Sequence, residues 1–105
     1  MLRFLVMLAL AAVCTMAVAG APAPARRAEL LHLLRQDCGA CHGLTLKGGL
    51  GPSLEPAALA AKDADQLSFV ILQGRRGTPM PPWGAFLTEA EARWMVEQLK
   101  KGLPK

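Results

Sequence analysis

The chain has 105 residues, which is enough for one small domain. Twelve lysine and arginine residues outnumber eight acidic residues, giving a formal net charge of +4. The basic residues are spread along the chain without interleaved aromatic residues, and tyrosine is absent, so nucleic-acid binding has little support. The mild positive charge instead favours docking to an acidic protein surface.

Residues 1–19 have the layout of a secretory signal peptide. Arg3 precedes an apolar run over residues 4–13, and Ala17-Val18-Ala19 forms an A-x-A-like cleavage signal. The run is short for a membrane span, although an uncleaved N-terminal anchor is the alternative interpretation. Cys14 lies inside this leader and is interpreted as a passenger residue, not as a lipid attachment site. Export of this kind predicts a periplasmic protein.

The mature chain is predicted to be a tether followed by a single domain. Residues 20–27 contain two prolines and predict a flexible tether, and residues 28–105 are expected to form the domain. A mature chain this short can bury only a marginal core by itself. A large apolar prosthetic group would resolve that difficulty.

Hydrophobic periodicity and capping signals predict an all-α domain. Asp63 and Thr88 are each followed three residues later by Gln or Glu, which resembles a capping box, and a glycine follows each of these two helices. Residues 43–56 form a loop rich in glycine and proline, with a short helical turn expected at residues 56–61. No segment reads as a strand longer than two or three residues. The predicted helices are residues 26–36, 63–73 and 88–101.

The segment Cys38-Gly39-Ala40-Cys41-His42 is a C-x-x-C-H motif, the signature of covalent c-type haem attachment. Two thiols at this spacing can each add to a vinyl group of the porphyrin, and His42 then becomes the proximal iron ligand. A thioredoxin-like redox pair would need a strand–helix–strand context, which is missing here. A zinc site would need four ligands, and only Cys14 and His32 remain as candidates. The motif therefore predicts one haem c.

Met80 is the predicted second axial ligand of the haem iron. It lies between prolines in the run Thr78-Pro79-Met80-Pro81-Pro82-Trp83, so it belongs to a stiff loop and not to a helix face. A thioether raises the reduction potential of haem iron. Met95 and His32 are the alternative ligands, although core packing for Met95 and a surface or core role for His32 are the ordinary interpretations.

Further residues are expected to orient the haem and its ligands. The backbone carbonyl of Pro52, ten residues after His42, is the expected acceptor for the second imidazole nitrogen, and a simple loop proline is the alternative. Trp83 could donate its indole N–H to a haem propionate while covering the haem, or could only line the haem pocket. Arg75 and Arg76 could pair with propionates or form solvated docking charges.

With these residues in this order, the chain resembles the class I c-type cytochromes. The resemblance rests on the C-x-x-C-H motif, Gly51-Pro52, Met80 and a terminal helix that carries Trp94, and it covers nearly all of the mature chain. It implies a compact bundle with crossing terminal helices and one exposed haem edge. Residues 37–52 and 74–83 are most similar to the NirC-type small cytochromes, which are associated with the cytochrome cd-type nitrite reductase of denitrifying bacteria.

The resemblance implies a one-electron carrier and not an enzyme. Its expected partners are an upstream electron donor and nitrite reductase. The cytochrome would either donate electrons to nitrite reductase or supply a redox step in the maturation of that enzyme's special haem. Asp37 and Glu55 are isolated carboxylates that form no acid–base constellation. A ligand-binding or peroxidase-like haem protein would need an open iron position and distal polar groups, and only Thr78 lies near Met80. A tethered haem subunit of a larger complex is the third interpretation, and stable membrane insertion is not expected.

Overall fold

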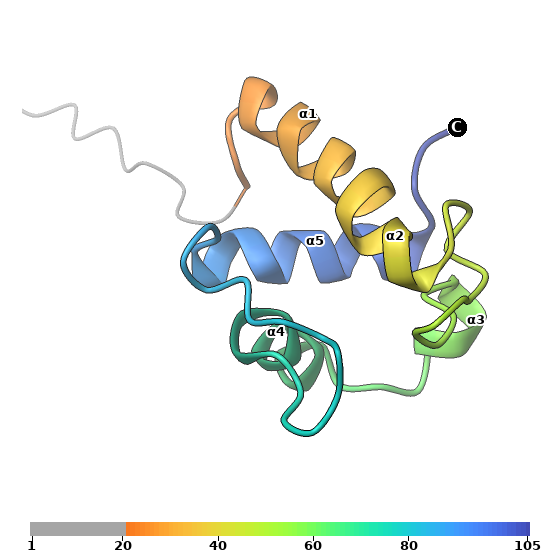
Figure 1. Cartoon of the computed structure of the whole chain (residues 1–105). Coiled ribbons are helices and arrows are strands. Elements are labelled where there is room, and N and C mark those ends of the chain that lie inside the picture. The colour runs from red at the N-terminus through yellow and green to blue at the C-terminus, as the bar shows by residue number, and fades with distance from the viewer. Residues whose placement is uncertain (1–20) are drawn as a thin grey trace, which may run out of the picture.

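The computed structural model describes residues 21–105, and the regular secondary structure in this part of the chain is helical, with loops between the helices (Figure 1). The predicted signal peptide, its cleavage site and Cys14 lie outside the described residues. Within residues 21–105 no strand is formed, so the all-α prediction is confirmed. The elements are α1 (Pro24–Leu33), the π-helical turn η1 (Leu34–Cys38), α2 (Gly39–His42), α3 (Pro56–Leu59), α4 (Ala64–Gln73) and α5 (Glu89–Lys101). None of the helices in this range combines the length and hydropathy needed to cross a membrane.

Helix α1 begins at Pro24, so the prediction of a flexible tether is wrong for residues 24–27. Proline suits the first turn of a helix because its missing N–H would have no intrahelical partner there. The first turn is also held by a distant contact, since Arg26 binds Glu91 at the start of α5. This tertiary contact, which the local sequence does not reveal, explains why the helix starts two residues before its predicted boundary.

The predicted first helix does not end at Gln36 but continues through η1 into α2. A π-helical turn contains one residue more than the corresponding α-helical turn and is found frequently at functional sites. Gly39 follows it with helical φ and ψ of −60° and −27°. Cys38, Cys41 and His42 therefore lie on a continuous helical segment and not on a turn after a helix.

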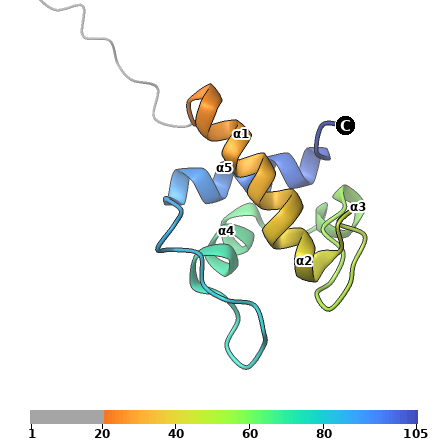
Figure 2. The same cartoon turned by 45° about the horizontal axis from the view of Figure 1, so that its top comes forward.

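Helix α5 is the central element of the bundle. Figures 1 and 2 show α1 crossing α5, as the family resemblance implied, with α4 packed along another side of α5. Leu30 and Leu34 contribute fully buried side chains from the α1 and η1 segment, and Met95 and Val96 do so from α5. Leu46, Leu59, Leu87, Ala92 and Leu99 complete the set of buried apolar residues.

The two predicted helix starts are confirmed, with one difference in capping. Thr88 and Glu91 form a complete capping box, in which the Glu91 N–H donates to Thr88 Oγ1 at 3.1 Å and the Thr88 N–H donates to Glu91 Oε1 at 2.9 Å. Asp63 accepts only one bond, from the Gln66 N–H at 2.9 Å, so it is a simple N-cap. Gly74 and Gly102 follow the last residues of these helices, as predicted.

We expect the Thr88→Ala variant to lower the free energy of unfolding by about 1 kcal/mol, because it removes the side-chain acceptor of the α5 capping box. Guanidinium unfolding of the haem-containing protein measures this loss. Thr45→Ala is the matched control, since Thr45 is exposed and caps no helix, and it should change stability by less than about 0.5 kcal/mol. Equal losses in both variants would contradict the capping role.

Candidate haem site

The two cysteines and the histidine of the motif are brought together by the end of η1 and by α2. Cys38 and Cys41 are three residues apart on this helical segment, which places both on one side, and neither forms a disulfide. Burial raises the pKa of the Cys38 thiol to about 11, and the negative charge of Asp37 adds to the effect. No strand lies beside the motif within residues 21–105, so the strand–helix–strand context of a thioredoxin-like redox pair is missing there.

The imidazole of His42 is held by the loop that follows it. His42 Nδ1 lies 2.7 Å from the carbonyl oxygen of Pro52, which is the contact predicted from the sequence. When Nδ1–H donates to a carbonyl, the lone pair is on Nε2, which is then the nitrogen available to a metal. We therefore propose Nε2 of His42 as the proximal iron ligand, oriented by Pro52.

This loop folds back because its backbone bonds to the last carbonyls of α2. The Gly51 N–H donates to Cys41 O at 2.8 Å, and the Gly48 N–H donates to His42 O at 2.8 Å. These bonds bring Pro52 into contact with the His42 imidazole, although the two residues are ten positions apart in the chain. The position of the predicted acceptor is thus a consequence of how the loop closes on the helix end.

Gly51 contributes by having no side chain, a role that the sequence analysis missed. A Cβ atom at this position would lie 2.7 Å from both Cε1 and Nδ1 of His42. Only glycine permits so close an approach of an imidazole ring to the backbone. The available signal was the Gly-Pro pair itself, because the glycine makes space for the ring and the proline supplies its acceptor.

The segment of residues 74–82, called here the Met80 loop, closes on the C-terminal end of α4. Where the loop begins, the Gly74 N–H donates to Val70 O at 2.8 Å, and inside the loop the Arg75 N–H donates to Met80 O at 3.3 Å. Where it ends, the Trp83 N–H donates to Ile71 O at 3.0 Å and the next residue donates to Leu72 O at the same distance. The loop is therefore fixed at both ends by the last turn of one helix, which agrees with the stiffness expected of a ligand-bearing loop.

Gly74 allows the two arms of the Met80 loop to approach each other. Its φ of +69° lies in the left-handed region, and a Cβ atom here would lie 2.8 Å from Met80 O and 2.9 Å from Pro81 C. Thr78 adds a further bond inside the loop, donating from Oγ1 to Arg75 O at 2.7 Å. The methionine is half-buried on a segment with little freedom to rearrange.

The alternative axial ligands are in their ordinary environments. Met95 is completely buried in the core between α5 and its neighbours, and His32 is exposed on α1. Met95 thus packs as the sequence predicted for a core residue. This arrangement favours Met80, and we propose it as the distal iron ligand.

The packing around the core fits a large apolar group. Several apolar residues contact the buried core while their own side chains are only half-buried, and a haem would cover such surface. The donor set also fits, since two unpaired thiols, one oriented imidazole and one loop methionine are the groups that haem c requires. The half-buried residues in contact with the core are Leu31, Leu33, Cys38, Leu54, Leu67, Ile71, Leu72, Trp83, Trp94 and Leu103.

Trp83, Arg75 and Arg76 lie at the two ends of the Met80 loop. The Trp83 ring is half-buried and lies 6.0 Å from the Phe86 ring, with a tilt of 59° between the planes. Both arginines are exposed, and within residues 21–105 neither side chain forms a hydrogen bond or an ion pair. The contacts to propionates predicted for Trp83 and Arg76 therefore stay proposals, beside the docking role for the arginines.

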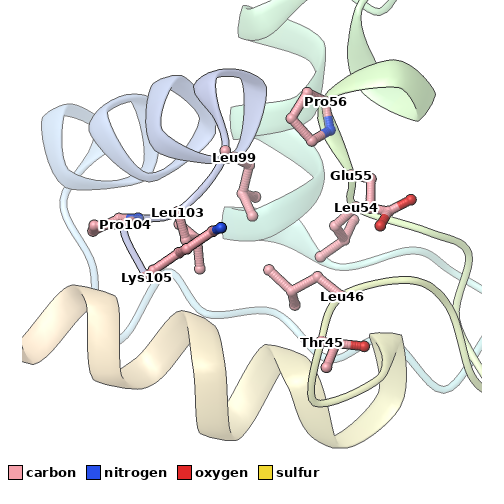
Figure 3. Close-up of a pocket in the computed structure, with 10 residues that line it drawn as sticks. Thr45, Leu46, Leu54, Glu55, Pro56, Leu99, Leu103, Pro104 and Lys105 are labelled. Carbon is pink, nitrogen blue, oxygen red and sulfur yellow. The ribbon is translucent and has the colours of Figure 1, made fainter.

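A hollow of about 580 Å³ lies elsewhere, between the loop after α2 and the C-terminal end of the chain (Figure 3). Leu46, Leu54, Leu99 and Leu103 point toward one another across it, and Pro104 and Lys105 form one wall. It contains neither the motif residues nor the Met80 loop. The hollow thus lies apart from these motif and loop residues, and it shares Leu54 and Leu103 with the half-buried residues named above.

Comparison with known proteins agrees with the assignment of a c-type haem site to this chain. Residues 25–98 match the family described as cytochrome c oxidase, cbb3-type, subunit III. The chain is 56% identical to cytochrome c55X of Paracoccus denitrificans over 85 residues, covering 81% of this chain and 82% of the relative. It is 51% identical to cytochrome c55X of Stutzerimonas stutzeri over 90 residues, covering 86% and 80%. The helical fold and these relatives define a mono-haem c-type cytochrome that transfers electrons.

A solved structure of the c-type cytochrome NirC superposes with a TM-score of 0.76 at 51% identity, covering 78% of this chain and 96% of NirC. The chain belongs to the NirC-type small c-type cytochromes, the family that also contains cytochrome c55X. It is also 40% identical to dihydro-heme d1 dehydrogenase of Pseudomonas aeruginosa, over 82% of this chain but only 17% of that enzyme.

We expect Gly51→Ala to destabilise the haem-containing protein by about 1–3 kcal/mol, because the added methyl group would overlap the His42 ring. Guanidinium unfolding monitored by haem absorbance measures the loss. Gly39→Ala is the matched control, since its Cβ atom would be 3.4 Å from the nearest atom and alanine favours helix. Equal stability of Gly51→Ala and the wild type would contradict the close packing of His42 on Gly51.

Proposed function

We propose that this cytochrome is a periplasmic one-electron carrier that donates electrons to the cytochrome cd-type nitrite reductase in denitrification. The observation that carries the proposal is that both proposed iron ligands are held in place. His42 is hydrogen-bonded to Pro52, and Met80 lies in a loop whose backbone is hydrogen-bonded to α4. Bound haem supplies the chemistry, because its iron can cycle between the ferrous and ferric states.

The other roles would belong to residues of the chain. Cys38 and Cys41 would hold the haem covalently, and His42 Nε2 and Met80 Sδ would be the ligands of its iron. Because His42 and Met80 both lie on segments held by hydrogen bonds to their neighbours, their positions would change little with the oxidation state of the iron. Little reorganisation of the chain would then accompany electron transfer, and a thioether ligand would favour ferrous iron and raise the reduction potential.

The surface beside the motif supports docking to an acidic partner. Leu44 and Leu50 are 71% and 90% exposed in the loop after α2, with exposed Lys47 between them in sequence. Arg75 and Arg76 add exposed positive charge on the Met80 loop. Exposed apolar and positively charged side chains on these two loops are suited to a transient complex with an acidic protein, in which charge mainly accelerates association.

The location and domain limits are part of the proposal. Residues 1–19 would direct export and be removed, leaving a short tether before α1, and the cytochrome domain would fill the rest of the chain. Covalent haem attachment on the outer side of the bacterial inner membrane supports a periplasmic location.

A second function is favoured by one comparison. Dihydro-heme d1 dehydrogenase, also represented by a NirN structure in complex with DHE, contains a region similar to this chain, with a TM-score of 0.62 at 39% identity over 16% of that protein. A cytochrome that resembles one region of such an enzyme could exchange electrons during maturation of the nitrite reductase haem. We keep this as the alternative to direct donation.

We expect Met80→Ala to abolish the weak far-red absorption band of sulfur-to-iron charge transfer in the ferric protein. The reduction potential should fall by on the order of 0.1 V or more, within the roughly 0.8 V range that axial ligands span. Met95→Leu is the control, because a volume-conserving change in the core leaves the ligands unchanged. A wild-type protein without the band, whose ferrous form readily binds carbon monoxide, would instead indicate a ligand-binding haem protein.

We expect the ferrous protein to reduce nitrite reductase at least as fast as that enzyme turns over, and the rate should fall as ionic strength rises. Rapid mixing measures the transfer. Arg76→Glu should slow it several-fold, and Arg27→Glu, which makes the same charge change on α1, should slow it less. Transfer far slower than turnover would contradict direct donation and favour the maturation role.

A further inference from the structure

We propose that Arg26 is a positioning residue that keeps the Met80 loop closed by clamping the start of α5 and the turn after the loop to the start of α1. The clamp consists of the Arg26 guanidinium, the Glu91 carboxylate and the backbone carbonyl of Phe86. It rests on the proposed function, because it assumes that Met80 is an axial ligand of iron.

The contacts of Arg26 join the start of α1 to two consecutive segments that lie 60 and 65 residues further along the chain. Its Nε bonds to Glu91 Oε2, and its Nη2 donates to the Phe86 carbonyl oxygen at 3.1 Å and lies 3.4 Å from Glu91 Oε1. Its Nη1 donates to Glu29 Oε2 at 2.8 Å within α1. The Glu91 side chain is 16% exposed and the Arg26 side chain 36%, so the pair is partly shielded from solvent.

The Phe86 carbonyl connects the clamp to the Met80 loop. The N–H groups of Phe86 and Leu87 both donate to Trp83 O, at 3.0 and 3.1 Å, so residues 83–87 form a tight turn directly after the loop. The Trp83 N–H in turn donates to Ile71 O in α4. The exit of the loop is therefore held by α4 at its near end and by Arg26 at its far end. Figures 1 and 2 show the starts of α1 and α5 at the same end of the bundle.

Glu91 is a fixed partner for the guanidinium because the α5 capping box already orients it. Its Oε1 accepts the Thr88 N–H at 2.9 Å. The hydrogen bond from Arg26 lowers the pKa of Glu91, and the Thr88 N–H adds to this effect. A forked guanidinium can bond a carboxylate and a carbonyl together, whereas a lysine ammonium on a flexible stem is less suited to this geometry.

Binding of imidazole to the ferric, haem-containing protein tests the clamp. If Met80 is an iron ligand, imidazole can bind only after Met80 dissociates, so the binding rate reports how readily the Met80 loop opens. Stopped-flow absorbance measures the rate. We expect Arg26→Gln to bind imidazole roughly tenfold faster than the wild type, as expected for the loss of about one hydrogen bond of a charged group. Arg26→Lys should give a smaller acceleration. Arg93→Gln is the matched control, since Arg93 joins α5 to Asp65 of α4 through an ion pair and does not contact the turn after the loop.

The controls separate the possible failures. If Arg26→Gln unfolds at lower denaturant but binds imidazole at the wild-type rate, Arg26 only stabilises packing between α1 and α5, and the inference is overturned. If Arg26→Gln cannot be obtained with haem, an unchanged rate in Arg26→Lys overturns it equally. If the wild type binds imidazole as fast as Met80→Ala, Met80 is not the ligand, and the proposed function fails together with the clamp.

Discussion

The contact between the His42 imidazole and the backbone of Gly51 and Pro52 is the interaction on which the proximal half of this structure depends. It requires a glycine that leaves space for the ring, a carbonyl that accepts a hydrogen bond from the ring and a loop that returns to the helix end. The loop returns because glycine N–H groups reach the last carbonyls of α2, which have no partner within the helix. A single hydrogen bond to the ring thus depends on the geometry of about ten residues.

The Met80 loop is built by the same principle on a different helix. It also starts beyond a helix end, contains a glycine with positive φ, and returns to donate backbone N–H groups to the final turn of the helix that it left. The unpaired carbonyls at helix C-termini therefore provide the attachment points for both loops. In each case a rigid helix end positions one proposed iron ligand, so the bundle serves mainly as a frame for two short loops.

Much of this arrangement could be predicted from the sequence because it is local. The capping box of Thr88 and Glu91, the glycine stops and the C-x-x-C-H motif each lie within a few residues, and local chemistry determines them. The Pro52 acceptor was predicted because a ligating histidine needs a partner for its second nitrogen. The start of α1 was misplaced, since Pro24 and Arg26 are helical partly through a contact with Glu91, 65 residues away. The packing of His42 on Gly51 was missed because only coordinates reveal the space that a Cβ atom would need.

The π-helical turn η1 sets the rotational phase between two faces of one continuous helix. The buried side chains of Leu30 and Leu34 define the face of this helix that packs in the core, and the C-x-x-C-H motif begins about one turn after Leu34. Each residue of an α-helix advances the helix by about 100°, so the additional residue of a π turn rotates everything after it by a comparable amount relative to an uninterrupted α-helix. The direction in which the thiols and the imidazole leave the bundle is therefore determined by the residue count between Leu34 and Cys38, as much as by the identity of the motif residues.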